Sequence, residues 1–146
     1  MTQIRVLYLC TGNSARSIIA EALTRSMAPD FEVSSAGTHP KGLNPYTLRL
    51  LEQEQLETSG ISSKGVDEFT SQEFDYVITV CDDAAEQCPV FPGAARRVHW
   101  SFPDPAAVEG DDDAKLAAFQ ETLDGMRDIL TYFIPIARQT IPEARA

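Results

Sequence analysis

Strand-like and helix-like segments alternate along the chain, and this alternation limits the possible folds more than any other feature of the sequence. Residues 4–9 and 74–80 are short apolar runs that predict buried strands, and residues 31–35 and 96–100 are further strand candidates. Because strands that alternate with helices form right-handed β-α-β units, the sheet should be mostly parallel. We therefore predict an α/β fold with three layers, in which helices cover both faces of an open, mostly parallel four-stranded sheet.

Two of the predicted helices have clear boundary signals. Asn44 followed by Pro45 is typical of a helix start, and Gly60 marks the expected end of this helix. The last helix begins near residue 112, and its apolar side chains have the spacing of a helix with one buried face. Proline lacks the backbone N–H that a helix interior needs, so we expect Pro135 to kink or end this helix.

The charge of the chain argues against two classes of partner. Its 146 residues include 12 Lys and Arg against 22 Asp and Glu, which gives a formal net charge of −10. Nucleic acids and anionic membranes both attract a surplus of positive charge, so we expect neither to bind. No apolar run is long enough to span a membrane, and the first residues do not resemble a signal peptide. We expect a single domain over residues 1–146 that works as a cytoplasmic monomer.

The first strand-like run leads into a polar, glycine-containing loop and then into a helical pattern. Cys10 is expected at the end of the strand, at the edge of the sheet where parallel α/β proteins bind their ligands. Ile18, Ala22 and Leu23 predict one apolar face on the helix that follows. A loop that curls around a helix start turns its backbone N–H groups toward one point and can bind an anion. The residues predicted to bind an oxyanion here are Thr11, Gly12, Asn13, Ser14, Ala15, Arg16 and Ser17.

Cys10 and Arg16 are the candidate catalytic residues of this loop. The planar guanidinium of Arg16 can bind two oxygens of a tetrahedral oxyanion. The positive field of the helix start favours the thiolate form of Cys10, to which Ser17 can donate a further hydrogen bond. A buried structural cysteine beside an unrelated arginine is the alternative, because a Cys-x5-Arg pattern alone is weak. The position of the pattern between a strand and a helix favours catalysis.

Asp104 is a candidate general acid on a second loop. It lies between two prolines just past residues 96–100, so a stiff loop is expected to hold it at the same edge of the sheet as Cys10. A carboxyl group there can protonate a leaving oxygen and later activate water. Taken alone, the same residues predict no more than an Asp-Pro turn.

The two other cysteines, Cys81 and Cys88, follow the strand predicted at residues 74–80. Cys81 is therefore expected at the same edge of the sheet as Cys10, and residues 82–87 are compatible with a short helix. A helix rises about 10.5 Å over seven residues, whereas a disulfide needs two Cα atoms within about 7 Å of each other. A Cys81–Cys88 disulfide would require this helix to unwind, which indicates a redox switch rather than a structural bond.

A zinc site and a place in the core are the alternatives for these cysteines. Three cysteines and His99 could form a Cys3His set, but the sequence lacks the short spacing of two to four residues between paired cysteines. We therefore expect no metal. As a small apolar core residue, Cys88 is poorly placed, because it ends an acidic segment directly before Pro89.

Together these motifs resemble the thioredoxin-coupled arsenate reductases, a family that shares its fold with the low-molecular-weight protein tyrosine phosphatases. The resemblance covers nearly the whole chain in order, and the combination is far more specific than any one motif. The segments that carry it are Cys10-Thr11-Gly12-Asn13-Ser14-Ala15-Arg16-Ser17, Ser35-Ala36-Gly37, Thr79-Val80-Cys81-Asp82 with Cys88-Pro89, and His99-Trp100-Ser101-Phe102-Pro103-Asp104-Pro105.

The resemblance implies a relay of three thiols. Cys10 would attack the arsenic of arsenate, which Arg16 and the loop amides hold, while Asp104 helps an oxygen to leave as water. Cys81 would then attack Cys10 and release arsenite, and Cys88 would attack Cys81 as the helix loops out. Thioredoxin would reduce the final disulfide, so no bound cofactor is implied. Phosphate or sulfate would bind as analogues of the substrate.

The chain departs from this family at two positions. Ala15 stands where some members have a further cysteine, which is not one of the three relay thiols. Some members bind potassium with residues that match Asn13, Ser35, Ser62 and Lys64. Because Lys64 replaces an acidic ligand, we predict that its ammonium takes the place of the cation and supports the loop through Asn13.

A phosphatase that hydrolyses phosphotyrosine is the main alternative, since it needs only Cys10, Arg16 and Asp104. Those phosphatases resemble one another in having a tyrosine after the Asp-Pro pair of the acid loop, where this chain has Ala106. A phosphatase also gives no role to the two later cysteines. A non-catalytic oxyanion sensor, whose cysteines report the redox state, is the third possibility, and turnover would exclude it.

Overall fold

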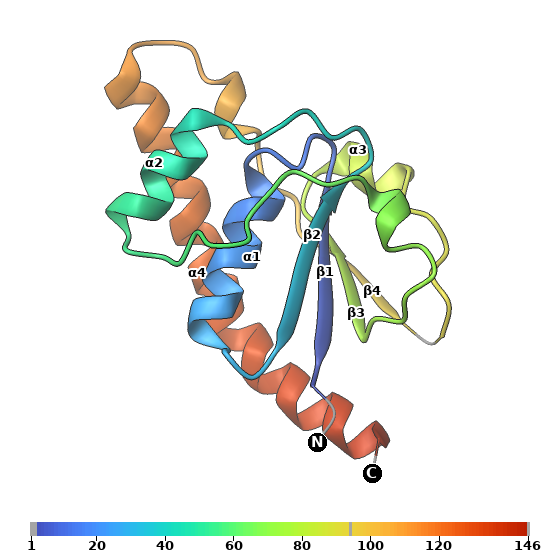
Figure 1. Cartoon of the computed structure of the whole chain (residues 1–146). Helices are drawn as coiled ribbons and strands as arrows, with labels where there is room; N and C mark the ends of the chain where they lie inside the picture. Colours follow the sequence, from blue (N-terminus) through green and yellow to red (C-terminus); the bar gives the residue numbers. More distant parts are fainter. Residues whose placement is uncertain (1–2, 94, 146) are drawn as a thin grey trace.

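The computed structural model describes residues 3–93 and 95–145, so four residues of the predicted domain (1, 2, 94 and 146) lie outside the described part. Four strands form one sheet: β1 (Arg5–Cys10), β2 (Glu32–Gly37), β3 (Tyr76–Thr79) and β4 (Arg96–His99). They lie in the order β2-β1-β3-β4, and all neighbouring strands are parallel (Figure 1). This topology confirms the predicted parallel sheet.

Helices lie on both sides of the sheet. They are α1 (Arg16–Met27), α2 (Pro45–Gln53), α3 (Asp82–Glu86) and α4 (Asp112–Arg145), with short 3-10 turns η1 (Val66–Glu68) and η2 (Pro105–Ala107). In Figure 1, α1, α2 and α4 lie on one side of the sheet and α3 on the other, where it packs against β1 and β3. The predicted three-layer α/β fold is therefore confirmed.

The position of each strand in the sheet explains how strongly the sequence predicted it. β1 has a neighbouring strand on each side and is covered on both faces, so Val6, Leu7 and Leu9 are fully buried and read as one apolar run. Tyr8 is also fully buried, with its hydroxyl 2.7 Å from Thr24 Oγ1 of α1. β4 is an edge strand with mostly exposed residues, which is why its pattern is weaker.

α1 is buried on more sides than the predicted single apolar face. Ile19 and Leu23 pack into the core cluster that includes the sheet residues. Ile18 and Ala22 instead form a second cluster with Leu51 of α2. The helix is therefore enclosed between the sheet and α2.

α2 begins as predicted but is shorter. The side chain of Asn44 accepts a hydrogen bond of 2.8 Å from the backbone N–H of Tyr46, and Pro45 occupies the first turn. The helix ends at Gln53 rather than near Gly60. The reason is Gln55, whose φ of 56° belongs to the left-handed region that a right-handed helix cannot contain.

We predicted that Pro135 kinks or ends the last helix. α4 does not end there but continues to Arg145, so the predicted end is wrong. Proline leaves the carbonyl of Thr131, four residues earlier, without its helical N–H donor. The core residues on both sides of the proline, Ile134 and Ala137, are buried against the rest of the protein. Their packing outweighs the lost hydrogen bond and keeps the helix continuous.

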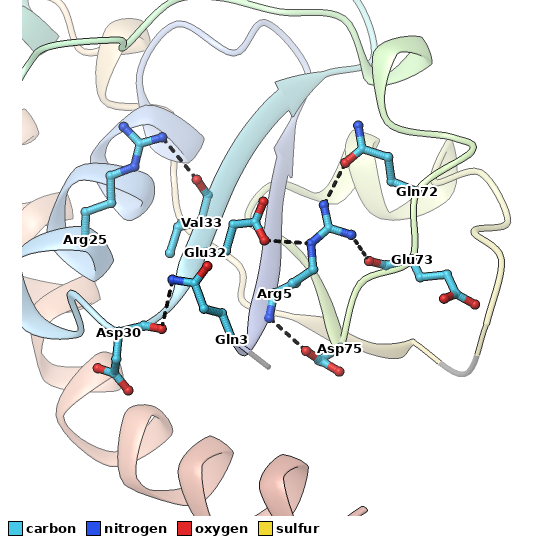
Figure 2. Close-up of polar contacts among 9 residues, drawn as sticks. All are labelled: Gln3, Arg5, Arg25, Asp30, Glu32, Val33, Gln72, Glu73 and Asp75. Carbon is cyan, nitrogen blue, oxygen red and sulfur yellow. Dashed lines mark hydrogen bonds and ion pairs between the residues drawn. The ribbon is translucent and has the colours of Figure 1, made fainter. Parts of the chain in front are cut away.

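Polar contacts around Arg5 close the end of the sheet where β1 begins (Figure 2). Its guanidinium donates to the Glu32 carboxylate at 3.0 Å, to Gln72 Oε1 at 2.7 Å and to the carbonyl of Glu73. Its backbone N–H donates to the carboxylate of Asp75 at 2.8 Å. These contacts join three segments at the amino end of β1, while the opposite end, where the strands lead into loops, carries the candidate site.

Candidate active site

The carbonyl groups of the loop between β1 and α1 are bound by the segment that follows β2. Because a peptide group is planar and trans, the N–H that follows each carbonyl points the opposite way. The N–H groups of residues 11, 12, 13 and 15 therefore point away from that segment, which is the arrangement predicted for an anion site. The bound carbonyls belong to Cys10, Thr11, Gly12 and Ser14, and they accept from the backbone N–H groups of residues 38, 39, 41 and 44 at 3.1, 2.8, 3.0 and 3.1 Å.

Two residues give the loop this shape. Asn13 has a φ of 45°, in the left-handed region that asparagine tolerates better than most residues. At Gly37, a Cβ atom would lie 2.6 Å from the carbonyl oxygen of Thr11 and 2.9 Å from the backbone nitrogen of Asn13. Only glycine therefore lets the end of β2 approach the loop this closely.

The thiol of Cys10 lies at the bottom of this loop and is almost fully buried. The backbone N–H of Asn13 donates to Cys10 Sγ at 3.2 Å, and Ser17 Oγ lies 2.8 Å from the same sulfur. Cys10 therefore lies at the N-terminal end of α1 with a backbone N–H and a hydroxyl group beside its sulfur. The predicted contact between Ser17 and Cys10 is present.

A buried polar network supports the loop from below. Asn13 Nδ2 donates to Ser17 Oγ at 2.7 Å and to Ser35 Oγ at 3.0 Å. Ser35 in turn donates to Glu21 Oε1 at 2.5 Å, and Arg25 pairs with the other carboxylate oxygen of Glu21 at 2.5 Å. Asn13, Ser35 and Glu21 are fully buried, so this network joins the loop to α1 and β2.

Lys64 supports the loop in a different way from the one predicted. Its backbone N–H, not its ammonium, donates to Asn13 Oδ1 at 2.7 Å. The ammonium binds the carbonyl of Ser62 at 2.9 Å and its hydroxyl at 3.4 Å, at an exposed position. The predicted contact of the ammonium with Asn13 is therefore wrong, because the lysine side chain extends outward and a backbone group already binds the amide oxygen.

Arg16, at the start of α1, lies near Asp104, which belongs to the loop that follows β4. Arg16 donates to the carbonyl of Phe102 at 3.0 Å and approaches Asp104 Oδ2 at 4.0 Å, with 16% of its side chain exposed. Asp104 Oδ1 accepts from the backbone N–H of Ala106 at 3.0 Å and caps η2. Asp104 thus forms the contact of an Asp-Pro turn, which was the alternative to a general acid. Its second carboxylate oxygen faces Arg16.

Two neighbouring cavities bring the predicted residues together. Thr11, Arg16 and Asp104 line both, so the two cavities meet at these side chains. The smaller, of about 180 Å³, is also lined by Cys10, Gly12, Ser14, Ala15 and Lys41. The larger, of about 420 Å³, is also lined by Cys81, Asp82, Ser101, Phe102 and Pro103.

Cys81 lies at the predicted edge of the sheet, but β3 ends at Thr79 rather than at residue 80, so Val80 separates the strand from the cysteine. Its thiol is almost fully buried, and Thr11 Oγ1 lies 3.4 Å from Cys81 Sγ. Thr11 directly follows Cys10 in the chain, so Cys81 contacts the side chain of the residue next to Cys10. Cys81 therefore lies beside the residue that follows Cys10, in the cavity that adjoins the one lined by Cys10.

Cys88 lies apart from both cavities, beyond the far end of α3. Its half-buried thiol lines a third cavity of about 160 Å³, together with Arg97 and His99. Burial raises the pKa of the Cys88 thiol above its ordinary value, and the charge of Arg97 opposes this rise only in part. All three cysteines are free thiols, and the short helix between Cys81 and Cys88 is present as predicted.

The sequence interpretation missed several residues at the site. Lys41 lines the smaller cavity, but nothing in its turn sequence indicates that it folds back over Gly12. Glu21 had a signal that could have found it, since a charged residue stands within the apolar part of α1. Asp82 and His99 form a contact of 2.9 Å that only the packing of α3 beside β4 creates.

Within the described residues, no group of three or more His, Cys, Asp and Glu side chains is arranged to hold a metal ion. In the same part of the chain, no helix combines the length and apolar character needed to cross a membrane.

Comparison with known proteins agrees with this geometry. The family model of the low molecular weight phosphotyrosine protein phosphatases matches residues 5–141. The chain belongs to this family. Within the family, it is similar to an arsenate reductase of Oceanobacillus iheyensis, with 33% identity over 134 residues that cover 91% of this chain and 96% of the relative.

Two solved structures of proteins named arsenate reductases are also similar to this chain. The structure of an arsenate reductase from Archaeoglobus fulgidus has a TM-score of 0.67 and 28% identity, covering 86% of this chain and 98% of that one. A thioredoxin-dependent arsenate reductase from Corynebacterium glutamicum has a TM-score of 0.61 and 28% identity, covering 88% of this chain and 61% of that one. Both enzymes are named for the same reaction.

Proposed function

We propose that this protein reduces arsenate to arsenite through a relay of the thiols Cys10, Cys81 and Cys88, and so contributes to arsenic detoxification. The observation that carries the proposal is the pair of joined cavities, with Cys10 in one and Cys81 in the other. Relatives named arsenate reductases, at 33% identity over most of the chain, support arsenate as the substrate.

The first step joins arsenate to the enzyme. The Cys10 thiolate attacks arsenic and forms a sulfur–arsenic bond, while an arsenate hydroxyl takes a proton from Asp104 and leaves as water. Arg16 and the N–H groups of the loop (residues 11–17) hold the remaining oxygens and compensate their charge. Lys41, which lines the same cavity, adds a further positive charge.

The next two steps move the disulfide outward. Cys81 attacks Cys10 Sγ, so a sulfur–sulfur bond forms, the sulfur–arsenic bond breaks and its electron pair reduces arsenic to arsenite. Cys88 then attacks Cys81, which releases the Cys10 thiolate and leaves a Cys81–Cys88 disulfide. Because α3 separates these cysteines, it must unwind in this step, as the distances in a helix and a disulfide require.

The last step needs an external dithiol. We propose thioredoxin, because the related Corynebacterium glutamicum enzyme is described as thioredoxin-dependent. Its two thiols would reduce the Cys81–Cys88 disulfide by exchange, so that the electrons come from thioredoxin and no bound cofactor is needed. We further propose that the protein acts as a cytoplasmic monomer and binds phosphate or sulfate as substrate analogues.

Phosphatase activity is the second candidate function, since Cys10, Arg16 and Asp104 face one cavity that suits a tetrahedral oxyanion. A phosphoenzyme at Cys10 would need no other thiol. Phosphatase chemistry gives Cys81 and Cys88 no role, which favours the reductase, and we expect at most weak hydrolysis of phosphotyrosine.

A coupled assay tests the proposal. The protein is incubated with arsenate, thioredoxin, thioredoxin reductase and NADPH, and the oxidation of NADPH is followed. We expect oxidation that depends on arsenate, and no such dependence would refute the reductase function. Replacing Cys88→Ser should limit the enzyme to one turnover, because the final disulfide cannot form. Sustained turnover by this variant with thioredoxin would refute the order of the relay.

A further inference from the structure

A chain of hydrogen bonds joins the start of α3 to the ends of β3 and β4, and the relay described above gives it no role. Thr79 Oγ1 lies 2.8 Å from His99 Nδ1, and His99 Nε2 lies 2.9 Å from Asp82 Oδ1. Ser101 donates to the same carboxylate oxygen at 3.2 Å. Asp82, the first residue of α3 and the neighbour of Cys81, is therefore held by two side chains from β4 and the loop after it.

The chemistry of the three side chains fits a fixed contact. Because a carboxylate oxygen can only accept, His99 Nε2 carries the proton of the hydrogen bond to Asp82. The hydrogen bond from His99, and then that from Ser101, lowers the pKa of Asp82, so its carboxylate is ionised. The contact thus joins the Nε2–H group of His99 to the ionised carboxylate of Asp82.

This contact opposes the movement that α3 must make. Asp82 is the first of the residues that have to leave the helix when Cys81 and Cys88 form a disulfide, whereas His99 belongs to the sheet. Within α3, the buried Ala84 is the other described anchor. Unwinding α3 from its first residue therefore breaks the bond between His99 and Asp82.

We propose that His99 is a positioning residue for the final thiol exchange, because it holds Asp82 and so keeps α3 wound. This inference rests on the thiol relay proposed above. The contact stabilises the reduced form with Cys88 apart from Cys81, and it disfavours a Cys81–Cys88 disulfide before arsenate has reacted. Only when the Cys10–Cys81 disulfide has formed does attack by Cys88 compensate for the broken contact.

The stability of the Cys81–Cys88 disulfide measures this effect without arsenate. In a Cys10→Ser background, the protein is equilibrated in mixtures of oxidised and reduced dithiothreitol, and the remaining thiols are alkylated and counted by mass spectrometry. The variants are His99→Phe, Asp82→Ala, both together, and His99→Gln, whose amide can still donate to Asp82. Asp82 has 78% of its side chain exposed, so Asp82→Ala does not depend on refilling a core position.

The expected change is modest, because exposed ion pairs contribute little. His99→Phe and Asp82→Ala should each raise the equilibrium constant of disulfide formation by about fourfold, equal to about 18 mV at about 30 mV per tenfold change. The double variant should show no further increase, since both changes remove the same contact. His99→Gln should stay close to the parent.

Each other outcome overturns the inference in a recognisable way. Unchanged equilibrium constants in both single variants would show that His99 does not hold α3, while the relay would stand. Additive effects in the double variant would show that His99 acts on something other than Asp82. If no Cys81–Cys88 disulfide forms at any ratio of dithiothreitol, the relay fails together with the role of His99.

Discussion

At the scale of single residues, the site depends on groups that shape the loop as much as on those that react. Cys10 can serve as a nucleophile because Asn13 and Ser17 contact its sulfur and Gly37 lets β2 approach. For Cys88, burial raises the pKa of the thiol, so this thiol is protonated at neutral pH. The three thiols therefore lie in different surroundings, with Cys10 and Cys81 almost fully buried and Cys88 half-buried.

Gly37→Ala should distort the oxyanion loop. The added Cβ would lie 2.6 Å from the Thr11 carbonyl oxygen, so the loop must shift by several tenths of an ångström. We expect the KM for arsenate to rise about tenfold or more, because misplaced amides lose their contacts with the oxyanion. Gly65→Ala is the matched control, since its Cβ would have only an ordinary contact of 3.6 Å with Pro40. An unchanged KM in Gly37→Ala would contradict this account of the loop.

The final thiol exchange should become faster as the pH rises past 9.0, the ordinary pKa of a thiol such as Cys88. Burial raises the pKa of the folded protein's Cys88, so the stability from keeping it protonated is present below pH 9.0 and is lost as the pH rises through the higher folded value. Below that value the thiolate fraction grows about tenfold per pH unit. Single-turnover samples, alkylated at successive times, measure the Cys81–Cys88 disulfide. A plateau in the rate below pH 9.0 would contradict the prediction.

At the scale of elements, the short helix α3 and the long helix α4 differ in how their helical form is stabilised. α3 has five residues, too few for a helix to be stable alone, so it depends on the burial of its Ala84 and on the contact of its Asp82 with His99. That weakness suits a segment that has to unwind in every turnover. α4 has 34 residues and keeps its helical form even through Pro135, because its buried face extends along the core.

Pro135→Ala should stabilise the protein. Alanine restores the N–H donor for the carbonyl of Thr131 and removes the ring that crowds the preceding turn. Because residue 135 is exposed, no core contact is lost, and we expect the free energy of unfolding to rise by about 1–3 kcal/mol. Urea unfolding followed by circular dichroism measures it, and arsenate turnover should stay unchanged. Equal or lower stability would show that α4 has adapted to the proline.

At the scale of the whole molecule, one end of the parallel sheet carries stabilising polar contacts and the opposite end carries the candidate site. The amino end of β1 is closed by the contacts of Arg5 with Glu32, Gln72, Glu73 and Asp75. The carboxyl end carries the loops of the site, because all four strands lead into loops at that edge. Stability and reactivity should therefore respond to different substitutions.

Arg5→Met tests this separation. Methionine keeps an apolar stem against Phe74 but removes the bonds to Glu32, Gln72 and Glu73. We expect the free energy of unfolding to fall by about 1–2 kcal/mol, because the guanidinium is partly buried and its removal takes the donor from three acceptors. The KM for arsenate should not change. A large rise in KM would show that the two ends of the sheet are coupled.

Much of the site was predictable because its residues are local in sequence. Cys10 and Arg16 belong to one strand–loop–helix unit, and Cys81 follows a strand whose apolar pattern is strong. The network below the loop was predicted only through Asn13 and Ser35, since Glu21 takes part by contacts between α1 and β2 that no local pattern contains. For the same reason, the ammonium of Lys64 was assigned to a contact that its backbone makes.

By itself, the sequence determined the order of strands and helices, the parallel sheet and the edge of the sheet that carries Cys10 and Cys81. These features follow from apolar periodicity and from the handedness of β-α-β units, which neighbouring residues contain. The tertiary structure decided where helices end and which side chains touch across elements. Packing kept α4 helical through Pro135, a left-handed residue ended α2 early, and the approach of α3 to β4 paired Asp82 with His99. Such contacts depend on positions in space that distant segments fix together, so no single segment contains them.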